Sequence, residues 1–384
     1  MDLDGAPRVG IVGGGQLARM SAAPAAALGV GLRVLATSPE ESAAQVIHDV
    51  VLGRHDDLQA LRRLAAGCDV VTFDHEHVPP AHLEQLEAMG VAVRPGPSAL
   101  FHAQDKIHMR QALTDIDVSC PRWRVVSALD HVEEFAEETG WPVVLKTSRG
   151  GYDGRGVWMV ESAAQAADVL AVPLAAGAQW LAEERIDFVQ ELSAQVARSP
   201  HGQAVAYPVV RTVQANGICA EVVAPAPGLA SARVVEAQEI ALRIARDLNV
   251  TGMLAVELFD DGHALYVNEL AMRPHNSGHW SIEGARTSQF ENHLRAVLDL
   301  PLGDPTLVAP YAVMVNILGG DVGGLYSAYR HVLARDPGLK VHLYGKEVRP
   351  GRKVGHVTVV GDDLERLLAR GRHAADYFAG VIDE

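Results

Sequence analysis

Residues 253–280 (MLAVELFDDGHALYVNELAMRPHNSGHW) contain two apolar runs on either side of the turn Asp-Asp-Gly. The runs 253–259 and 264–268 predict two strands, and the turn residues are those that close a β-hairpin. Two carboxylates accompany these strands, Glu257 within the first and Glu269 directly after the second. If both face one way, their oxygens suit one or two hard cations such as Mg²⁺, and not zinc. An edge-strand glutamate beside a solvated loop is the alternative.

The segment after the hairpin is crowded with hydrogen-bond donors. It contains Arg273, His275, Asn276, Ser277 and His279. A loop of this composition suits a polar, anionic ligand. Because it directly follows the two carboxylates, we favour a binding site over a solvated turn.

Composition limits the class of protein. The chain has 384 residues, and 48% of them are hydrophobic, which is enough for two or three domain cores. A formal net charge of −15 argues against a general surface for nucleic acid or for an anionic membrane, so any phosphate must be met by local cations. The three cysteines match no metal or redox spacing. An acidic N-terminus, with no apolar run long enough to span a bilayer, predicts a cytoplasmic protein.

Strand and helix signals alternate in the N-terminal third of the chain. An apolar run at 8–12 ends in a glycine turn, and a helix is predicted from Gln16. Further strands are predicted at 32–36, 49–52 and 69–73. This succession is typical of an α/β domain with a doubly wound parallel sheet.

The glycine turn reads GGGQLA and satisfies the pattern G-x-G-x-x-A of dinucleotide-binding proteins. However, the second strand ends in Ala36, Thr37 and Ser38, where such a site has an acidic residue. We therefore interpret the turn as the seat of a substrate phosphate at a helix N-terminus. A turn that only packs helix on strand is the alternative, and an oxidoreductase would rest on this motif alone.

Acidic and histidine side chains follow the fourth predicted strand. The segment TFDHEHVPP places Asp74 and Glu76 at the carboxyl edge of the sheet, where open α/β sheets bind ligands. We select Glu76 as the substrate-facing group, although an acid at a strand end can equally cap a helix or be solvated. One helix from Ala99 to Leu113 is predicted to lead into a second unit.

Residues 141–160 (WPVVLKTSRGGYDGRGVWMV) predict a strand, a glycine-rich loop and a returning strand. Lys146 ends the first strand and can meet a phosphate as a point charge, while backbone N–H groups of the loop close over phosphate oxygens. The loop is not a Walker A motif, because G-x-x-x-x-G-K-[ST] is missing and no helix follows. We expect a mobile flap that excludes water, and an ordinary hairpin is the alternative.

The rest of the chain continues in mixed strands and helices. The crossing from Glu183 to Glu191 could supply backbone hydrogen bonds to an adenine and a carboxylate to a ribose. Near the end, KEVRPGRKVGH (346–356) concentrates cations around a Pro-Gly turn, which suits a phosphate, although a solvated turn is equally expected. Strands are predicted at 179–183, 203–213, 217–224 and 311–317, and helices at 163–171, 231–248 and 324–334.

Taken together, GGGQLARM, GGYDGRG, Glu257 with Asn268-Glu269, RPHNSGHW and KEVRPGRKVGH resemble the motifs of the N5-carboxyaminoimidazole ribonucleotide synthetases, a family of ATP-grasp enzymes. The motifs stand in the same order, from about Arg8 to about Gly361. Each motif alone is weak evidence, but the ordered set is specific.

The resemblance implies an α/β, ATP-grasp fold of three domains. These are a Rossmann-like domain at 1–105, an ATP-grasp module at 106–300 with a mobile lid at about 124–186, and a small C-terminal domain at 301–384. It also implies a homodimer that binds small molecules, and neither nucleic acid nor a membrane.

The family's reaction uses ATP, bicarbonate and Mg²⁺, for which Mn²⁺ can substitute. Bicarbonate attacks the γ-phosphate to give carboxyphosphate, which either releases CO₂ or is attacked directly, and the exocyclic amine of 5-aminoimidazole ribonucleotide is carboxylated. Two alternatives stay open: another ATP-grasp ligase acting on a phosphorylated amine such as glycinamide ribonucleotide, and a catalytically inactive nucleotide-binding protein.

The resemblance also assigns roles to residues. Expected catalytic groups are Glu76, Tyr152, Arg155 and Arg273, and expected metal ligands are Glu257 and Glu269. Expected ATP contacts are His102, Lys146, Gly151, Tyr152, Asp153, Gly154, Arg155, Gly156, Val157, Glu183, Glu184, Arg185, Ile186, Glu191, Gln214, Asn268 and Glu269. Expected ribonucleotide contacts are Gly15, Gln16, Leu17, Glu76, His275, Asn276, Ser277, Lys346, Arg352 and Lys353.

Two positions depart from the family pattern. His102 stands where the family usually has an arginine, and Gln214 stands where it usually has a histidine. Arginine to histidine gives up a permanent charge, so we expect weaker ATP binding and an unchanged metal site.

Overall fold

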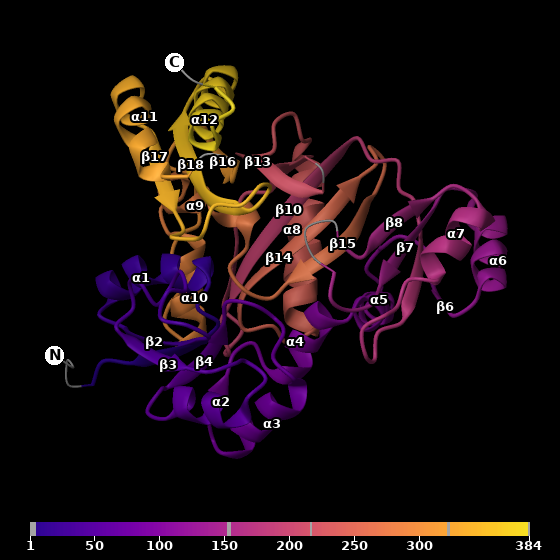
Figure 1. Ribbon diagram of the computed structural model, residues 1–384, viewed down its shortest axis with the longest axis horizontal. Coiled ribbons are helices and arrows are strands. Elements are labelled where there is room, and N and C mark those ends of the chain that lie inside the picture. Colours follow the sequence, from indigo (N-terminus) through magenta and orange to yellow (C-terminus); the bar gives the residue numbers. More distant parts are fainter. Residues whose placement is uncertain (1–4, 152–154, 216, 321–322, 383–384) are drawn as a thin grey trace.

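A computed structural model describes residues 5–151, 155–215, 217–320 and 323–382. Its N-terminal unit is a parallel sheet in the order β3-β2-β1-β4-β5, with helices on both faces (Figure 1). The predicted doubly wound domain is confirmed. Its strands are β1 (Arg8–Val12), β2 (Gly31–Ala36), β3 (Asp49–Leu52), β4 (Val70–Phe73) and β5 (Ala92–Val93). Its helices are α1 (Gln16–Leu28), α2 (Leu58–Ala65) and α3 (Pro80–Ala88).

The single helix predicted from Ala99 to Leu113 is wrong. The structure has two helices there, α4 (Pro97–Gln104) and α5 (Lys106–Asp115), separated at Asp105. Asp105 has extended backbone angles, and its Oδ1 accepts hydrogen bonds from the N–H groups of Ile107 and His108 at 3.0 and 3.1 Å. An aspartate that caps a new helix ends the preceding one, because the cap residue must leave the helical conformation.

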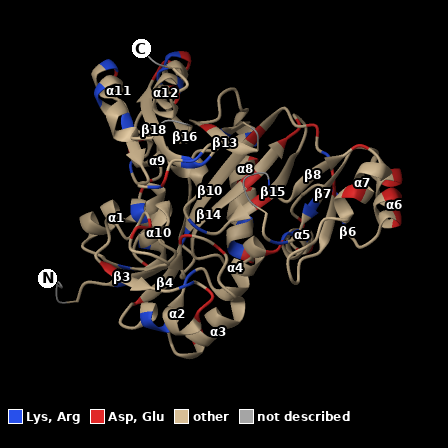
Figure 2. Cartoon of the chain, viewed as in Figure 1, with Lys and Arg blue, Asp and Glu red and all other residues tan. Residues whose placement is uncertain are grey.

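A small antiparallel sheet, in the order β6-β9-β7-β8, lies at one end of the molecule with two helices packed on it (Figure 1). The aromatic side chains of Phe135 and Trp180 lie in its separate apolar core. The outer helix α6 carries a run of acidic side chains, so part of the negative charge of the chain lies far from the glycine turn (Figure 2). The elements are β6 (Trp123–Val126), α6 (Leu129–Thr139), β7 (Val143–Thr147), β8 (Val157–Val160), α7 (Ala163–Leu170) and β9 (Trp180–Glu184).

A large sheet runs through the rest of the chain in the order β15-β14-β10-β12-β13-β16-β18-β17, with β11 beside β10. The strands after residue 301 extend this sheet through the pair β13 and β16, and do not form a sheet of their own. Its strands are β10 (Gln190–Arg198), β11 (Ala204–Ala206), β12 (Val210–Ala215), β13 (Ile218–Ala224), β14 (Gly252–Asp260), β15 (Leu265–Ala271), β16 (Tyr311–Leu318), β17 (Lys340–Leu343) and β18 (Lys353–Gly361).

The one strand predicted over 203–213 is divided into β11 and β12. The break contains Pro208, which has no N–H group for a ladder hydrogen bond. The helices of this part are α8 (Ser231–Asp247), α9 (Ser281–Gly284), α10 (Gln289–Val297), α11 (Tyr329–Arg335) and α12 (Leu364–Ala379), with 3-10 turns η1 (Asn276–Gly278) and η2 (Leu325–Ala328). Of these, α9, α10 and α12 were not predicted from the sequence.

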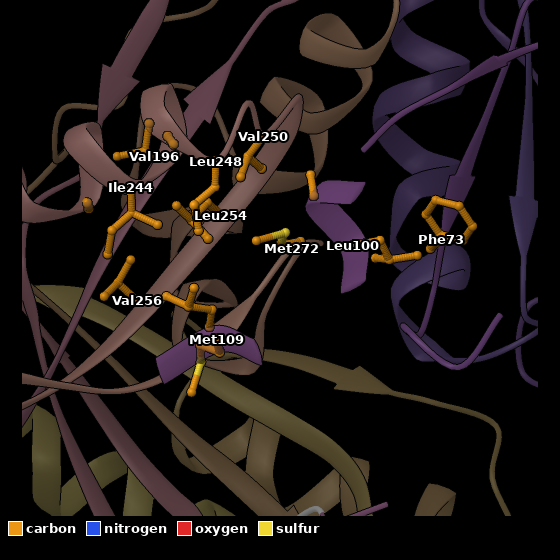
Figure 3. Close-up of a cluster of buried hydrophobic side chains, with 14 of the residues drawn as sticks. Phe73, Leu100, Met109, Val196, Ile244, Leu248, Val250, Leu254, Val256 and Met272 are labelled. Carbon is orange, nitrogen blue, oxygen red and sulfur yellow. The ribbon is translucent and has the colours of Figure 1, made fainter. Parts of the chain in front are cut away.

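One apolar core joins the N-terminal sheet to the large sheet. It runs from Phe73 on β4 through Leu100 on α4 and Met272 to Leu254 on β14, and it includes Met109 on α5 (Figure 3). All five side chains are buried, and each contributes about 1.5–3 kcal/mol when fully removed from water. The carboxyl edge of the N-terminal sheet is therefore held firmly against the β14–β15 hairpin.

The buried histidine of this junction makes folding sensitive to acid. On α10, Nδ1 of His293 accepts a hydrogen bond from the N–H of Met253 at 3.1 Å, and Nε2 lies 2.8 Å from Oγ1 of Thr72. Burial lowers the pKa of His293 to about 3. An unfolded histidine binds a proton below about pH 6.5, so stability should fall as pH drops from there towards 3, by up to about 1.4 kcal/mol per pH unit for one site.

We predict that His293→Gln lowers the slope of the free energy of unfolding against pH by the contribution of one titrating group. The measurement is urea unfolding between pH 7.5 and 5. The exposed His263 provides the control, because its ring is solvated in both states and His263→Gln should leave the slope unchanged. An unchanged slope in His293→Gln would contradict the prediction.

No helix in the described part of the chain is long and apolar enough to cross a membrane.

Candidate active site

The two carboxylates of the hairpin lie directly opposite each other. β14 and β15 pair with Glu257 beside Glu269, and β10 places Ser193 on the other side of Glu257. Residues paired across neighbouring strands point to the same face, so the prediction that both glutamates face one way is confirmed. The side chains of Glu257 and Glu269 are 26% and 44% exposed, so both are partly buried and still within reach of solvent.

The two carboxylates differ in charge state. Desolvation, together with the charges of Glu269 and Glu191, raises the pKa of Glu257 to about 8. Desolvation also acts against Glu269, but nearby cations, chiefly Lys106, outweigh it and hold the pKa of Glu269 below its usual value. Nearby negative charges keep one carboxyl group protonated, and a bound cation would offset their repulsion. The Glu257 and Glu269 pair is therefore suited to bind a cation.

Magnesium fits this donor set. Within the residues that the structure describes, no group of three or more His, Cys, Asp or Glu side chains could hold a metal ion. In nucleotide sites, Mg²⁺ is bound by one or two carboxylates, while phosphate oxygens and waters complete its octahedron. Glu257 and Glu269 can supply that partial shell to an ion that arrives with a nucleotide.

A buried ion network lies beside the metal pair. Arg110 and Lys146 bind opposite oxygens of Glu183 at 2.7 and 2.6 Å, and all three side chains are less than 10% exposed. Burial would raise the pKa of Glu183, but these two cations lower it to about 2. Nζ of Lys146, the lysine predicted at the end of β7, also donates to Oδ1 of Asn268 at 3.2 Å, and its charge helps to lower the pKa of Glu269. The carboxylate of Glu183 is committed to this network.

Arg273 and Glu76 join the tail of the hairpin to the N-terminal sheet. Nε of Arg273 donates to Oε2 of Glu76 at 2.7 Å. Burial disfavours the charge of Arg273, but Glu76, Asp74 and Glu269 raise its pKa. Two candidate residues that lie far apart in the sequence are thus in direct contact.

The polar loop, residues 273–279, is hydrogen-bonded to β10 through Ser277, and its His275 lies near Glu257. Oγ of Ser277 lies 2.7 Å from Oγ of Ser193 and accepts a hydrogen bond from Nε2 of Gln195 at 3.2 Å. All three residues are buried. Nε2 of His275 lies 3.7 Å from Oε1 of Glu257. Burial, with the charge of Arg273 adding to it, lowers the pKa of His275 to about 3, so its ring is neutral near pH 7.

Known proteins match this arrangement along the whole chain. Family models match in succession: the ribonucleotide synthetase preATP-grasp domain at residues 7–104, the ATP-grasp domain at 111–290, and the phosphoribosylaminoimidazole carboxylase C-terminal domain at 312–370. The N5-carboxyaminoimidazole ribonucleotide synthase of Mycobacterium tuberculosis strain H37Rv is 55% identical over 379 residues, covering 97% of this chain and 88% of its own length. The chain belongs to the N5-carboxyaminoimidazole ribonucleotide synthase family.

More distant relatives and solved structures of the family agree. The synthase of Corynebacterium ammoniagenes is 44% identical, covering 98% of this chain and 93% of its own. A structure of the Aspergillus clavatus enzyme complexed with ATP has a TM-score of 0.89 at 32% identity, covering 98% of this chain and 99% of that chain. A second structure from that organism, in complex with ADP and 5-aminoimidazole ribonucleotide, has a TM-score of 0.88 at 30% identity over the same shares. The predicted ATP-grasp fold is confirmed.

Lys106 lies beside the hairpin carboxylates, and no role was predicted for it from the sequence. Its Nζ lies 3.2 Å from Oε1 of Glu269, with only 16% of the side chain exposed. His102 stacks on His108 with ring centroids 4.6 Å apart, and burial lowers the pKa of His102 to about 4; its contact with ATP stays a prediction. The sequence signal for Lys106 is its place as the first residue of a helix, directly after the capping residue Asp105. That signal can be used only if the helix break at Asp105 is recognised.

The glycines of the flap are required by its geometry. A Cβ on Gly151 would lie 2.7 Å from the carbonyl oxygen of Arg155, and one on Gly156 would lie 2.6 Å from Oγ1 of Thr147. Gly156 also has a φ of +75°, which favours glycine. Val157 begins the returning strand β8, as predicted. The expected ATP contacts Tyr152, Asp153 and Gly154 lie outside the described residues.

The residues expected to hold the nucleoside are spread over β9, β10 and β12. Glu191 on β10 is two residues from Ser193 and shares its face, and burial raises the pKa of Glu191. Arg122 pairs with the carboxylate of Glu184 at the end of β9. Gln214 lies at a β-bulge in β12. The roles given to Glu184, Arg185, Ile186, Glu191 and Gln214 stay predictions.

The two ends of the chain meet at the expected ribonucleotide site. Nζ of Lys346 donates to Oε1 of Gln16 at 2.5 Å. Arg352 donates to the carbonyl oxygen of Glu347 at 3.2 Å, and Lys353 begins β18. The charge of Lys353 contributes to the low pKa of His275, which places this cation near the polar loop.

One backbone donor next to the glycine turn is already bound within the chain. Oδ1 of Asp74 accepts a hydrogen bond from the N–H of Ala18 at 2.8 Å, so a carboxylate of the chain already binds at the start of α1. A Cβ on Gly15 would lie 2.0 Å from Oδ2 of Asp74, so this carboxylate requires glycine there. The phosphate seat at this turn therefore has one N–H group fewer to offer, and it stays a prediction, as do the ribonucleotide contacts assigned to Gly15 and Leu17.

Proposed function

We propose that this chain uses ATP and bicarbonate to carboxylate 5-aminoimidazole ribonucleotide to N5-carboxyaminoimidazole ribonucleotide in purine biosynthesis. The observation that carries the proposal is the meeting of three groups around the β14–β15 hairpin. These are the Glu257 and Glu269 pair, the lysines Lys106 and Lys146, and the Arg273 contact with Glu76. Phosphoryl transfer needs positioned cations and charge neutralisation, and no nucleophilic side chain.

In the first half of the reaction, a bicarbonate oxygen attacks the γ-phosphorus of ATP. The bond from that phosphorus to the β–γ bridging oxygen breaks, which gives carboxyphosphate and ADP. Lys106 and Lys146 hold phosphate oxygens, and Arg273 stabilises the charge on the transferring phosphoryl group. Glu257 and Glu269 would hold Mg²⁺, whose chemistry here would be to neutralise negative charge on the nucleotide's phosphates.

In the second half, the exocyclic amine of the ribonucleotide forms a bond to the carboxyl carbon, inorganic phosphate leaves and the amine loses a proton. Glu76 orients Arg273 and lies at the carboxyl edge of the N-terminal sheet, where the amine would arrive. The flap, including Tyr152 and Arg155, would close over the intermediate and exclude water. Lys346, Arg352 and Lys353 would receive the 5′-phosphate.

The resemblance extends the proposal to the organisation of the enzyme. The domains would be 1–105, 106–300 and 301–384, with the lid at about 124–186 moving as a unit. The working form would be a cytoplasmic homodimer, with Mg²⁺ replaceable by Mn²⁺.

We predict that release of ADP requires 5-aminoimidazole ribonucleotide, bicarbonate and Mg²⁺ together. The measurement is an ADP-release assay in which each component is omitted in turn. Stimulation by glycinamide ribonucleotide instead would favour another ligase of the superfamily. No dependence on either ribonucleotide would refute the proposal.

A further inference from the structure

We propose that Asn316 is a positioning residue for the ribonucleotide site, which acts by fixing Asn276 and the polar loop. The inference rests on the proposed function and deepens it. Asn316 lies on β16, in the segment matched by the C-terminal domain model, and β16 extends the large sheet next to β13. The C-terminal segment would thereby help to shape the acceptor site through an uncharged residue, in addition to its cations.

The two asparagines form a reciprocal pair. Nδ2 of Asn276 donates to Oδ1 of Asn316 at 3.0 Å, and Nδ2 of Asn316 donates to Oδ1 of Asn276 at 2.7 Å. Nδ2 of Asn316 also donates to the carbonyl oxygen of Cys219 at 2.7 Å. A carbonyl oxygen can only accept, so this third bond decides which way the amide of Asn316 points and, through it, the amide of Asn276.

The pair is one of the fixed points of the loop. On the opposite side, Gln289 accepts from the N–H of His275 at 2.9 Å and donates to the carbonyl oxygen of His275 at 2.8 Å. A Cβ on Gly278 would lie 2.4 Å from Oε1 of both Gln195 and Gln289, so the turn is closely enclosed. With its backbone held in this way, the loop presents His275 to Glu257.

A purely structural role would not require an amide at this position. Asn316 is 4% exposed and interrupts the otherwise apolar strand YAVMVNIL. Burying an amide is costly unless every partner is in place, and a pair of apolar side chains can replace such a contact with little loss. The directional hydrogen bonds to Asn276 are what an apolar residue could not supply.

The test is steady-state kinetics of Asn316→Ala, with ribonucleotide and ATP varied separately. We expect KM for 5-aminoimidazole ribonucleotide to rise roughly tenfold, as for the loss of about 1.4 kcal/mol of hydrogen bonding, while kcat and KM for ATP change less than about twofold. Asn276→Ala should show the same pattern. The double variant should raise KM for the ribonucleotide no further than Asn276→Ala alone, because both substitutions remove the same interaction.

Asn292→Ala is the matched control. Asn292 is also a buried asparagine with three hydrogen bonds, to Tyr207 and to the backbone N–H and carbonyl of Gly303. Its replacement should lower the melting temperature and leave KM for the ribonucleotide unchanged. If Asn316→Ala does not fold, Asn316→Ser keeps a hydroxyl group and serves in its place.

Three results would overturn the inference: an unchanged KM for the ribonucleotide, an equal rise in KM for ATP, or additive effects in the double variant. If the wild-type enzyme shows no dependence on the ribonucleotide, the proposed function fails and the role of Asn316 fails with it.

Discussion

Glu269→Gln is expected to remove turnover and to leave the fold intact. Gln has the same shape and can still accept the hydrogen bond from Lys106 at 3.2 Å, but it carries no charge. The hairpin would then present only one carboxylate to the metal and nucleotide. Since catalysis of phosphoryl transfer depends on that charge neutralisation, we expect kcat to fall by about 10²–10⁴-fold.

The unfolding transition should distinguish lost chemistry from lost structure. Lys106 and other nearby cations hold Glu269 in its charged form, so Gln gives up a partly exposed ion pair but keeps the hydrogen bond from Lys106. The variant without ligands should therefore lose no more than about 1 kcal/mol in the free energy of unfolding. Its response to Mg²⁺ and ATP should also be reduced, because binding to the native state alone raises the melting temperature.

The matched control for this substitution is Glu221→Gln on β13. Glu221 accepts two hydrogen bonds from Arg372 at 2.6 and 2.8 Å, and it makes no contact with the hairpin carboxylates in the described structure. The same chemical change there should leave kcat within about twofold of the wild type, as for most substitutions away from a site. Wild-type turnover in Glu269→Gln would contradict the metal role of the hairpin.

Local patterns were sufficient to predict most strands. The N-terminal strands and the hairpin are short apolar runs bounded by glycine, proline or aspartate, and these signals act within a few residues. The errors arose where one polar residue redirects the chain. Asp105 begins a new helix inside an apparently continuous one, and Pro208 divides a strand that has the correct alternation.

The site could be predicted where its residues belong to sequence motifs. Glu257, Glu269 and Lys146 stand out as charged residues on apolar strands, and the structure brings them together. Lys106 and Asp74 could not be placed in the same way, since their roles depend on contacts between separate elements: Lys106 reaches a different sheet, and Asp74 caps a helix more than fifty residues earlier. Sequence spacing carries no information about such tertiary contacts.

Arg110→Met is expected to cause the largest loss of stability. Arg110 is fully buried, and its Nε donates to Glu183 at 2.7 Å while its two terminal nitrogens donate to the carbonyl oxygens of Val267 and Asn268 at 3.1 and 2.8 Å. Met fills a similar volume without a donor. It would leave two backbone acceptors unpaired and Glu183 with Lys146 alone, at a cost of about 3–5 kcal/mol in the free energy of unfolding.

Urea unfolding of Arg110→Met, Arg110→Lys and Arg243→Met separates charge from geometry. Lysine keeps the charge but cannot reach one carboxylate and two carbonyls at once, so Arg110→Lys should lose an intermediate amount of stability. Arg243 is exposed on α8, and Arg243→Met should change the free energy of unfolding by less than about 1 kcal/mol. If Arg110→Met and Arg243→Met were equally stable, the buried network would not be what holds β15 against α5. Since β15 carries Glu269, weakening this attachment should also raise KM for ATP, in contrast to Asn316→Ala.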